Sequence, residues 1–324
     1  MCCTHSPIRV SGTARRVTVE TTQGQSTART GSGKTSALSA NDKSHRSHTS
    51  IVIRRLLRSP QAVVGGVILI TLVLVALAAP LIAPHDPLEM SVVDQFQAPS
   101  TQNFFGTDEF GRDVFSRVLH GAQISLRVGL MATLIAVGGG TLLGMVAGYF
   151  GRWVDSVGQK IMDTLLAFPG LLLALAIIAV LGPGLRNVLI ALGIGGMPYY
   201  ARLVRGQVLS IKEREFIEAA RVVGARHPRI MLRHILPNTV SPLIVVGSLD
   251  LGWNILAAAS LSFIGLGAQP PTPEWGFMLS AGRDFMRDQW WISTFPGIAI
   301  VLAVLSFNLL GDGLRDAFDP QSRD

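Results

Sequence analysis

A run of twenty-two uncharged residues, from position 62 to position 83, constrains this chain more than any other feature. It reads AVVGGVILITLVLVALAAPLIA. As an α-helix rising about 1.5 Å per residue, it would be roughly 30 Å long, which matches the hydrocarbon core of a bilayer. A helix that is apolar on every side needs an apolar environment all round. The run therefore predicts a membrane-spanning helix.

Five further stretches are apolar enough to be membrane helices. Hydrophobic residues make up 48% of the chain and charged residues only 15%, against about 25% charged in soluble domains. The fourth and fifth stretches contain glycine and proline, which membrane helices tolerate where neighbouring helices satisfy the backbone. We therefore predict an all-α membrane protein with six transmembrane helices, the last five near residues 126–148, 161–181, 187–203, 238–266 and 292–310.

The charges are unevenly distributed along the chain. Residues 1–60 carry a net charge of +8 and the remainder carries −1. Because residues 1–50 have few large apolar side chains, we expect them to be a disordered basic arm beside the membrane, with nucleic-acid binding as the weaker alternative. The segment 84–124 has a net charge of −4 and the segment 202–233 has +5. Positive charges favour the cytoplasmic side, so this pattern predicts that both termini are cytoplasmic.

We find no catalytic or nucleotide-binding motif in the sequence that has the context such a motif needs. Residues 28–35 match a loose phosphate-binding loop, but they lack the preceding strand and following helix that such a loop needs. The two cysteines, Cys2 and Cys3, are adjacent at the N-terminus, and we place all seven histidines outside the predicted spans. We expect no metal site, no bound cofactor and no catalytic residues in this chain.

Two features of the predicted spans indicate packing. Gly140, Gly144 and Gly148 repeat at intervals of four, so one face of the second span lacks side chains and another helix can approach closely. A helix that is merely rich in glycine is the alternative. Pro169 removes a backbone donor, so we expect a kink in the third span.

The segment from residue 212 to residue 237 has the pattern of a short amphipathic helix bounded by turns. Phe216, Ala220 and Val223, with Ile217 alongside, fall on one face, and charged residues fall on the other. Gly224 suits a left-handed turn, and Pro228 suits the first turn of a second helix. We expect this helix to sit in a groove of another protein, the alternative being a basic loop with a surface helix.

Within this segment, Glu218-Ala-Ala-x-x-x-Gly224 followed by Leu236-Pro237 resembles the EAA loop of permease subunits of binding-protein-dependent ABC importers. His234 stands where the family pattern has isoleucine. The stretches 105–117, 261–276 and 308–316 are similar to the C-type subunit of dipeptide and oligopeptide permeases. The resemblance covers roughly residues 50–320.

The resemblance implies a type I importer permease fold over residues 51–324, in the plasma membrane of a bacterium. It implies partners: a second permease subunit, one or two ATPase subunits that bind ATP and Mg²⁺, and an extracytoplasmic substrate-binding protein. It implies that the EAA helix couples ATP hydrolysis to transport. The implied coupling residues are Glu215, Phe216, Glu218, Ala219, Ala220, Gly224 and Ala225, with Pro237 as a structural position.

Asp250 lies in the middle of the predicted fifth span, close in sequence to Trp253 and Asn254. A carboxylate inside a span is costly and usually faces a cavity or a partner, so we consider these three residues as candidates for the substrate pathway. A hydrogen bond to the partner subunit is the alternative. We expect Arg127 and Asp163 to lie at the membrane interface, and residues 269–276 to form a rigid loop because they are rich in proline.

The sequence leaves open which substrate is transported and which energy source drives the transport. The resemblance covers importers of dipeptides, oligopeptides, glutathione-like peptides and nickel chelates. An ion-driven secondary transporter would show a repeated half and several carboxylates within the membrane. The predicted spans contain one such carboxylate, Asp250, and no visible repeat, so we favour the ABC importer.

Overall fold

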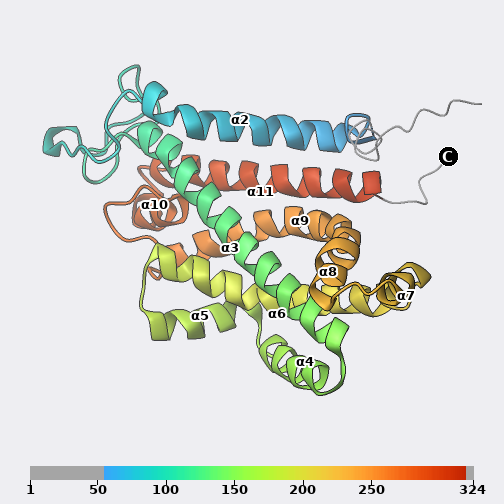
Figure 1. The fold of residues 1–324 in the computed structure, drawn as a ribbon. Coiled ribbons are helices and arrows are strands. Elements are labelled where there is room, and N and C mark those ends of the chain that lie inside the picture. Colours follow the sequence, from blue (N-terminus) through green and yellow to red (C-terminus); the bar gives the residue numbers. More distant parts are fainter. Residues whose placement is uncertain (1–54, 319–324) are drawn as a thin grey trace, which may run out of the picture. The chain divides into compact units, whose positions relative to one another are not determined.

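A computed structural model describes residues 55–318 of the chain. The predicted disordered arm at 1–50, with its loop-like motif, lies outside the described residues. The described part consists of helices joined by turns and loops, the longest of which, residues 83–113, connects α2 to α3 (Figure 1). They are α2 (Pro60–Ile82), α3 (Val114–Phe150), α4 (Arg152–Leu166), α5 (Gly170–Leu181), α6 (Leu185–Ile211), α7 (Glu215–Val222), α8 (His227–Ile230), α9 (Leu236–Phe263), α10 (Trp275–Ala281) and α11 (Trp291–Phe318).

Four helical runs of the described part are long and apolar enough to cross a membrane. These are α2, α3, the run 227–263 that contains α8 and α9, and α11. A fifth arises if α4 and α5 are taken together as one bent span. The predicted fourth span corresponds to α6, which is 27 residues long but is not apolar enough to be counted by composition. The chain is therefore an all-helical membrane protein, and six spans remain a prediction.

The second span begins earlier than the sequence pattern predicts, at Val114 and not near residue 126. Asp113 starts it, because its side chain accepts a hydrogen bond from the backbone amide of Ser116. Residues 114–125 are thus helical, and three histidines lie in helical runs that contain candidate spans: His120 in α3, and His227 and His234 in the run 227–263. The signal that could have found this start is an aspartate three residues before a serine.

The third span is broken and not continuous. α4 ends at Leu166 and α5 begins at Gly170, and the two axes meet at 94°. Pro169 occupies the N-terminal cap position of α5, where its missing N–H costs nothing. Asp163 forms an ion pair with Arg202 of α6, and Asp155 accepts hydrogen bonds at 2.5 and 2.6 Å from Arg205. α4 is thereby attached along α6.

Close packing of α3 against α6 forms the middle of the helical unit. A Cβ atom on Gly140 would come within 2.5 Å of the Tyr200 Cβ, and one on Gly148 would come within 2.9 Å of the Val208 Cβ. Gly144 lies against the backbone of Ala201 in the same way. The glycine stripe therefore lies against α6, where a larger residue has no room.

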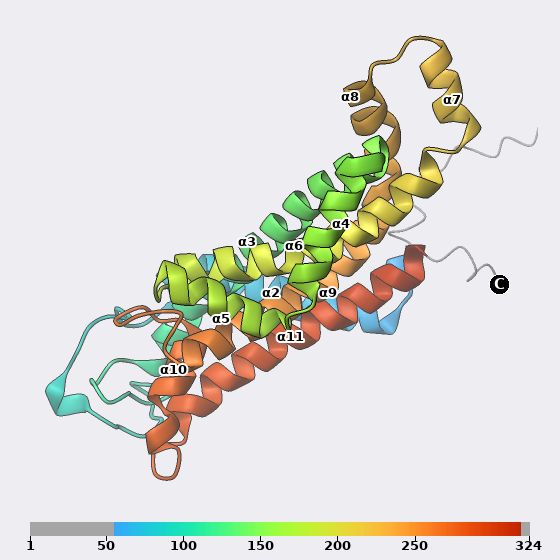
Figure 2. The ribbon, with the colours of Figure 1, turned by 90° about the horizontal axis from the view of Figure 1, so that it is seen from below.

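Two candidate functional regions lie at opposite ends of this unit. Figure 2 shows α7 and α8 at one end, and α10 with the segment between α2 and α3 at the other. α10 begins at Trp275, so the predicted proline-rich loop ends earlier than expected. Its first turn is capped by the Glu274 side chain, which accepts from the amides of Gly276 and Phe277.

Candidate functional site

The first candidate region is the hairpin formed by α7 and α8, which we call the coupling hairpin (residues 215–230). α7 stops where Gly224 adopts φ = 81°, a left-handed conformation that glycine takes without strain. The amide of Gly224 donates to the Arg221 carbonyl at 2.9 Å and that of Ala225 donates to the Ala220 carbonyl at 3.0 Å. Pro228 lies in the first turn of α8. Both turns agree with the sequence prediction.

One side chain anchors α7 to the rest of the molecule. Ile217 is fully buried, in a cluster with Ile230, Ile235 and Val208. Ala220 and Ala225 are partly buried against the same cluster. This cluster connects the hairpin to α3, α6 and α9, so a displacement of α7 would act directly on the helices of the core.

The apolar residues of α7 are not all buried. Phe216 is 41% exposed and Val223 is 85% exposed, so they do not share a buried face with Ala220. Val222 is 90% exposed. α7 has only eight residues, and the chain turns away from it at Gly224. Burial of Ile217 alone sets which side of the helix faces the core, and Val222 and Val223 then point away from it. Helical periodicity gives a face but not which face is buried.

The remaining coupling candidates form the outer surface of the hairpin. Glu215, Glu218 and Ala219 are exposed, and Ala220 is turned inwards. Within residues 55–318, the side chains of Glu215 and Glu218 form no hydrogen bond or ion pair. α7 therefore presents acidic residues next to exposed apolar ones, on a surface that its own chain does not cover.

Two polar contacts that sequence analysis missed join the hairpin region to the end of α3. The hydroxyl of Tyr149 lies 2.7 Å from Nδ1 of His227, and Nζ of Lys212 donates to the carbonyl of Gly148 at 3.1 Å. No local pattern predicts either contact, because the paired residues lie 78 and 64 positions apart in the sequence. Pro237 lies in the first turn of α9, directly after the π-helical turn Met231–Ile235.

The second candidate region is a cavity of about 210 Å³ between α5, α6 and α9, which we call the central cavity. Asp250, Trp253 and Asn254 all line it, so the structure brings the three pathway candidates to one place. Tyr200 donates its hydroxyl to Oδ2 of Asp250 at 2.6 Å, and Asn254 donates to the hydroxyl of Thr133 at 2.8 Å. The tyrosine partner comes from another helix and has no signal in the sequence around Asp250.

The third region is the segment between α2 and α3, residues 83–113, which we call the acidic segment. It is folded around Asp108, whose carboxylate accepts from Nε of Arg112 at 2.7 Å and lies 3.6 Å from Nε of Arg117. All three side chains are buried. Arg117 also donates to the carbonyl of Pro87 at 2.8 Å. Sequence analysis noted this stretch by resemblance but missed its buried ion pairs.

Two carboxyl groups near this end have shifted pKa values. Burial, and next the charge of Asp108, raises the pKa of Glu109 above its usual range. Burial also raises the pKa of Glu274, although the amides of Gly276 and Phe277 oppose the shift by donating to its carboxylate. Both groups lie outside the helices that are apolar enough to span a membrane.

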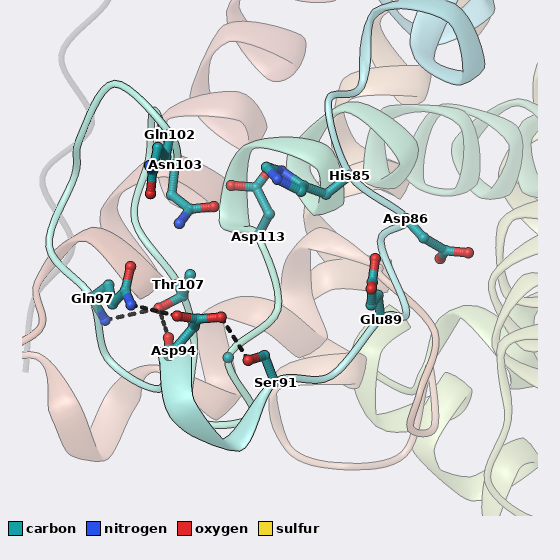
Figure 3. Close-up of a pocket in the computed structure, with 11 residues that line it drawn as sticks. His85, Asp86, Glu89, Ser91, Asp94, Gln97, Gln102, Asn103, Thr107 and Asp113 are labelled. Carbon is teal, nitrogen blue, oxygen red and sulfur yellow. Dashed lines mark hydrogen bonds and ion pairs between the residues drawn. The ribbon is translucent and has the colours of Figure 1, made fainter.

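The acidic segment also surrounds a polar cavity of about 410 Å³ (Figure 3). Four carboxylates line it, together with amide and hydroxyl side chains. Within residues 55–318, no group of three or more His, Cys, Asp or Glu residues is spaced to hold a metal ion.

Comparison with known families and proteins gives consistent matches. The family described as "Binding-protein-dependent transport system inner membrane component" matches residues 140–324, and the "N-terminal TM domain of oligopeptide transport permease C" matches residues 47–99. The dipeptide transport system permease protein DppC of Alkalihalophilus pseudofirmus is 48% identical over 270 residues, covering 83% of this chain and 89% of the relative.

A second relative, the glutathione transport system permease protein GsiD of Escherichia coli, is 52% identical over 269 residues, again 83% of this chain and 89% of the relative. Among solved structures, the inward-facing MetNI methionine ABC transporter aligns with a TM-score of 0.50 and 18% identity. That alignment covers 63% of this chain and 97% of the solved chain, and at this identity it bears on the fold alone. The chain therefore belongs to the family of binding-protein-dependent transport system inner membrane components.

Proposed function

We propose that this chain is one of two permease subunits that together form the translocation pathway of an ATP-driven importer of dipeptides and oligopeptides. The relatives named for dipeptide and glutathione transport support a peptide substrate. The observation that carries the proposal is the coupling hairpin. It attaches α7 to the core through Ile217 and leaves the acidic and apolar outer face of α7 uncovered by the rest of residues 55–318.

In this proposal α7 seats in a groove of a separate ATPase subunit, which binds the ATP and Mg²⁺. Phe216, Ala219 and Val222 contribute apolar contacts, and Glu218 contributes polar ones. When two ATPase subunits close on ATP, they move α7, and the cluster around Ile217 passes the movement to α3, α6 and α9. The pair of permeases then changes which side of the membrane its pathway opens to.

The charge distribution supports the orientation that this function needs. Residues 202–233, which contain α7, carry a net charge of +5, and the segment 84–124 carries −4. Since basic segments favour the cytoplasm, the hairpin faces the ATPase side and the acidic segment faces outwards. We propose six spans, with α6 as the fourth and both termini cytoplasmic.

We further propose that the central cavity is part of the substrate pathway. Oδ2 of Asp250 accepts from Tyr200, and within residues 55–318 no hydrogen bond reaches Oδ1, which is left for a peptide ammonium group. The Asp250→Asn variant keeps an oxygen for Tyr200 and removes the charge. We expect it to raise the apparent KM for a dipeptide about tenfold, the value of one charge-assisted hydrogen bond.

Uptake by the purified complex in proteoliposomes measures that KM. If Asp250 bonds to the second permease instead, Asp250→Asn will lose that subunit on purification and leave the KM of the intact complex unchanged. Labelled dipeptide, glutathione and a nickel chelate, offered in separate assays, distinguish the substrate alternatives.

The proposed function as a whole is tested by affinity purification from native membranes, followed by reconstitution. We expect recovery of a second permease, one or two ATPases and a substrate-binding protein, and ATP-dependent uptake that ionophores do not abolish. Uptake that collapses with an ionophore and continues without ATP would assign the chain to the secondary transporters instead.

A further inference from the structure

The cavity of the acidic segment has an unusual electrostatic character. Asp86, Glu89, Asp94 and Asp113 all line it, and none of its lining residues is lysine or arginine. Its single titratable base is His85. The cavity walls therefore carry four carboxylates without a permanent positive charge among them (Figure 3).

The walls of this cavity are fixed by the chain's own hydrogen bonds. Asp94 accepts from the hydroxyl of Ser91 at 2.6 Å and from Nε2 of Gln97 at 2.7 Å, as the dashed lines in Figure 3 show. The backbone amide of Gln97 donates to the hydroxyl of Thr107 at 2.8 Å. Gly111 has φ = 73° and packs so closely on Ser91 that a Cβ atom has no room. The cavity is preformed and does not need a ligand to shape it.

Asp113 supplies a second, independent indication of a ligand. Its side chain is 2% exposed, and its Oδ2 accepts two hydrogen bonds from Ser116. Its Oδ1 is buried and has no hydrogen-bond partner among the described residues. Figure 3 shows a carboxylate oxygen of Asp113 directed towards the side of the cavity where Asn103 lies. A buried charge is weakly screened, so it adds to the negative potential of the cavity.

The size of the cavity and the spacing of its carboxylates indicate which kind of cation it can bind. At about 410 Å³ the cavity is many times the roughly 30 Å³ that one water occupies in the liquid. No three of its acidic or histidine side chains are close enough together to hold a metal ion. An extended organic cation, an ammonium or guanidinium group on a long side chain, matches both the room and the charge.

We propose that this cavity receives a lysine or arginine side chain of the substrate-binding protein when that protein docks on the permease. The inference rests on the proposed function, which places the acidic segment on the outer side. A transported peptide is the poorer match, because no residue of α5, α6 or α9 lines this cavity whereas those helices enclose the central cavity. Charge complementarity of this kind sets docking rate and orientation.

Glu89 is the residue to change. Its carboxylate lines the cavity and, within residues 55–318, forms no hydrogen bond or ion pair, so replacing it leaves the walls intact. We expect Glu89→Gln to weaken docking of the co-purified substrate-binding protein about 3- to 10-fold, and Glu89→Lys to weaken it more than about 30-fold. The measurement is Kd by surface plasmon resonance on the full complex in nanodiscs.

Asp288→Asn is the matched control. Asp288 is an exposed carboxylate on the segment between α10 and α11, at the same end of the unit, and it does not line the cavity. We expect its Kd to stay within about twofold of the native value. Docking to the native complex should also weaken between about 50 and about 300 mM salt, and Glu89→Gln should flatten that dependence.

Three results would overturn the inference. Docking that Glu89→Lys leaves unchanged would show that no cation enters the cavity, and ATP-dependent uptake by the same sample would leave the proposed function standing. Docking abolished by EDTA would assign the cavity to a divalent cation. Absence of docking by the native complex, together with absence of ATP-dependent uptake, would overturn both proposals.

Discussion

At one end of the helical unit, α7 is fixed by a single fully buried side chain, Ile217. At the other end, the acidic segment buries Asp108, Arg112 and Arg117 against one another. The first end exposes Val222, and no side chain of residues 55–318 forms a hydrogen bond or ion pair with the carboxylates of Glu215 and Glu218 there. The second pairs these three buried charges with one another and surrounds a preformed cavity lined by four carboxylates.

This difference shows how one chain can combine a helix that is easily displaced, α7, with a segment of fixed shape, the acidic segment. A short helix with one apolar anchor can be moved as a lever, because displacing it breaks few internal bonds. A segment held by buried ion pairs keeps its shape, because opening it would leave charges unpaired in the interior. The comparison therefore predicts that variants at the two ends fail in different ways.

The largest effect is expected at the acidic end, from Arg117→Met. This variant fills the space of the side chain but leaves Asp108 with one arginine fewer and leaves the Pro87 carbonyl without its donor. Breaking a buried pair in this way costs about 3–5 kcal/mol. We expect the complex to denature at a clearly lower temperature and to be recovered in low yield.

The matched control is Arg283→Met, which removes a 61% exposed arginine from an ion pair with Asp284 at the same end. It should change stability by less than about 1 kcal/mol. Thermal denaturation of the purified complexes measures both. Equal melting temperatures for Arg117→Met and the native complex would show that the buried pairs do not hold this end.

A smaller effect is expected from Ile217→Ala in the coupling hairpin. Removing this fully buried side chain leaves a cavity and should cost about 2–3 kcal/mol, at the low end of such changes because α7 lies beside solvent. We expect hydrogen exchange of residues 215–230 to accelerate while the rest of the unit is unchanged.

Val222→Ala tests the other face of the same helix. Val222 is 90% exposed, so stability should change by less than about 0.5 kcal/mol, while the affinity of the ATPase subunit falls. If Val222→Ala destabilised the complex as much as Ile217→Ala does, the assignment of the buried face would be wrong.

Gly224→Val comes next in free energy. Space is available for its side chain, since, apart from its two chain neighbours, no heavy atom of the described residues lies within 4 Å of a Cβ there. The cost is the left-handed backbone at φ = 81°, about 1–2 kcal/mol for a residue with a Cβ. We expect the complex to fold and assemble but to lose transport, because α7 no longer sits at the right angle.

Gly224→Asn is the control, since asparagine tolerates the left-handed conformation. It should retain most of the native uptake rate. Full substrate-stimulated ATPase activity in Gly224→Val would contradict the coupling role that we propose for this hairpin.

The smallest effect is a pH dependence from Glu274 at the acidic end. Burial raises its pKa in the folded state, so the folded protein holds a proton that the unfolded chain has released. The contribution of Glu274 to stability is therefore fully present below the ordinary carboxyl pKa of about 4.3, and it is lost as pH rises through the window between that value and the folded pKa. Glu274→Gln should reduce this fall, as measured by melting temperature against pH. An identical pH profile for the two proteins would show that Glu274 is not the group responsible.

Local sequence signals predicted the parts of the molecule that depend on neighbouring residues alone. The uncharged run at 62–83 is α2, nearly to the residue. Gly224 takes the left-handed turn because no other residue type does so without cost, and Pro228 starts α8. The glycine stripe at 140–148 lies against α6, as close packing requires.

Features that depend on tertiary contacts could not be predicted. The buried side of α7 is decided by a cluster drawn from α3, α6 and α9, and periodicity alone did not show that Ile217 is buried while Phe216 and Val223 are exposed. The 94° break between α4 and α5 was expected only as a kink. The bond from Tyr200 to Asp250 joins residues fifty positions apart, and nothing local marks it.

The central claim is that α7 contacts a separate ATPase subunit, and a cross-linking measurement tests it most directly. Val222→Cys, in a chain whose Cys2 and Cys3 are replaced by serine, would be labelled with a benzophenone in the native complex and irradiated. We predict a covalent product with the ATPase subunit, identified by mass spectrometry, and no such product from a cysteine at the exposed position of Leu77 on the apolar helix α2. A transport-competent complex in which Val222→Cys cross-links only to lipid or to its own chain would contradict the account.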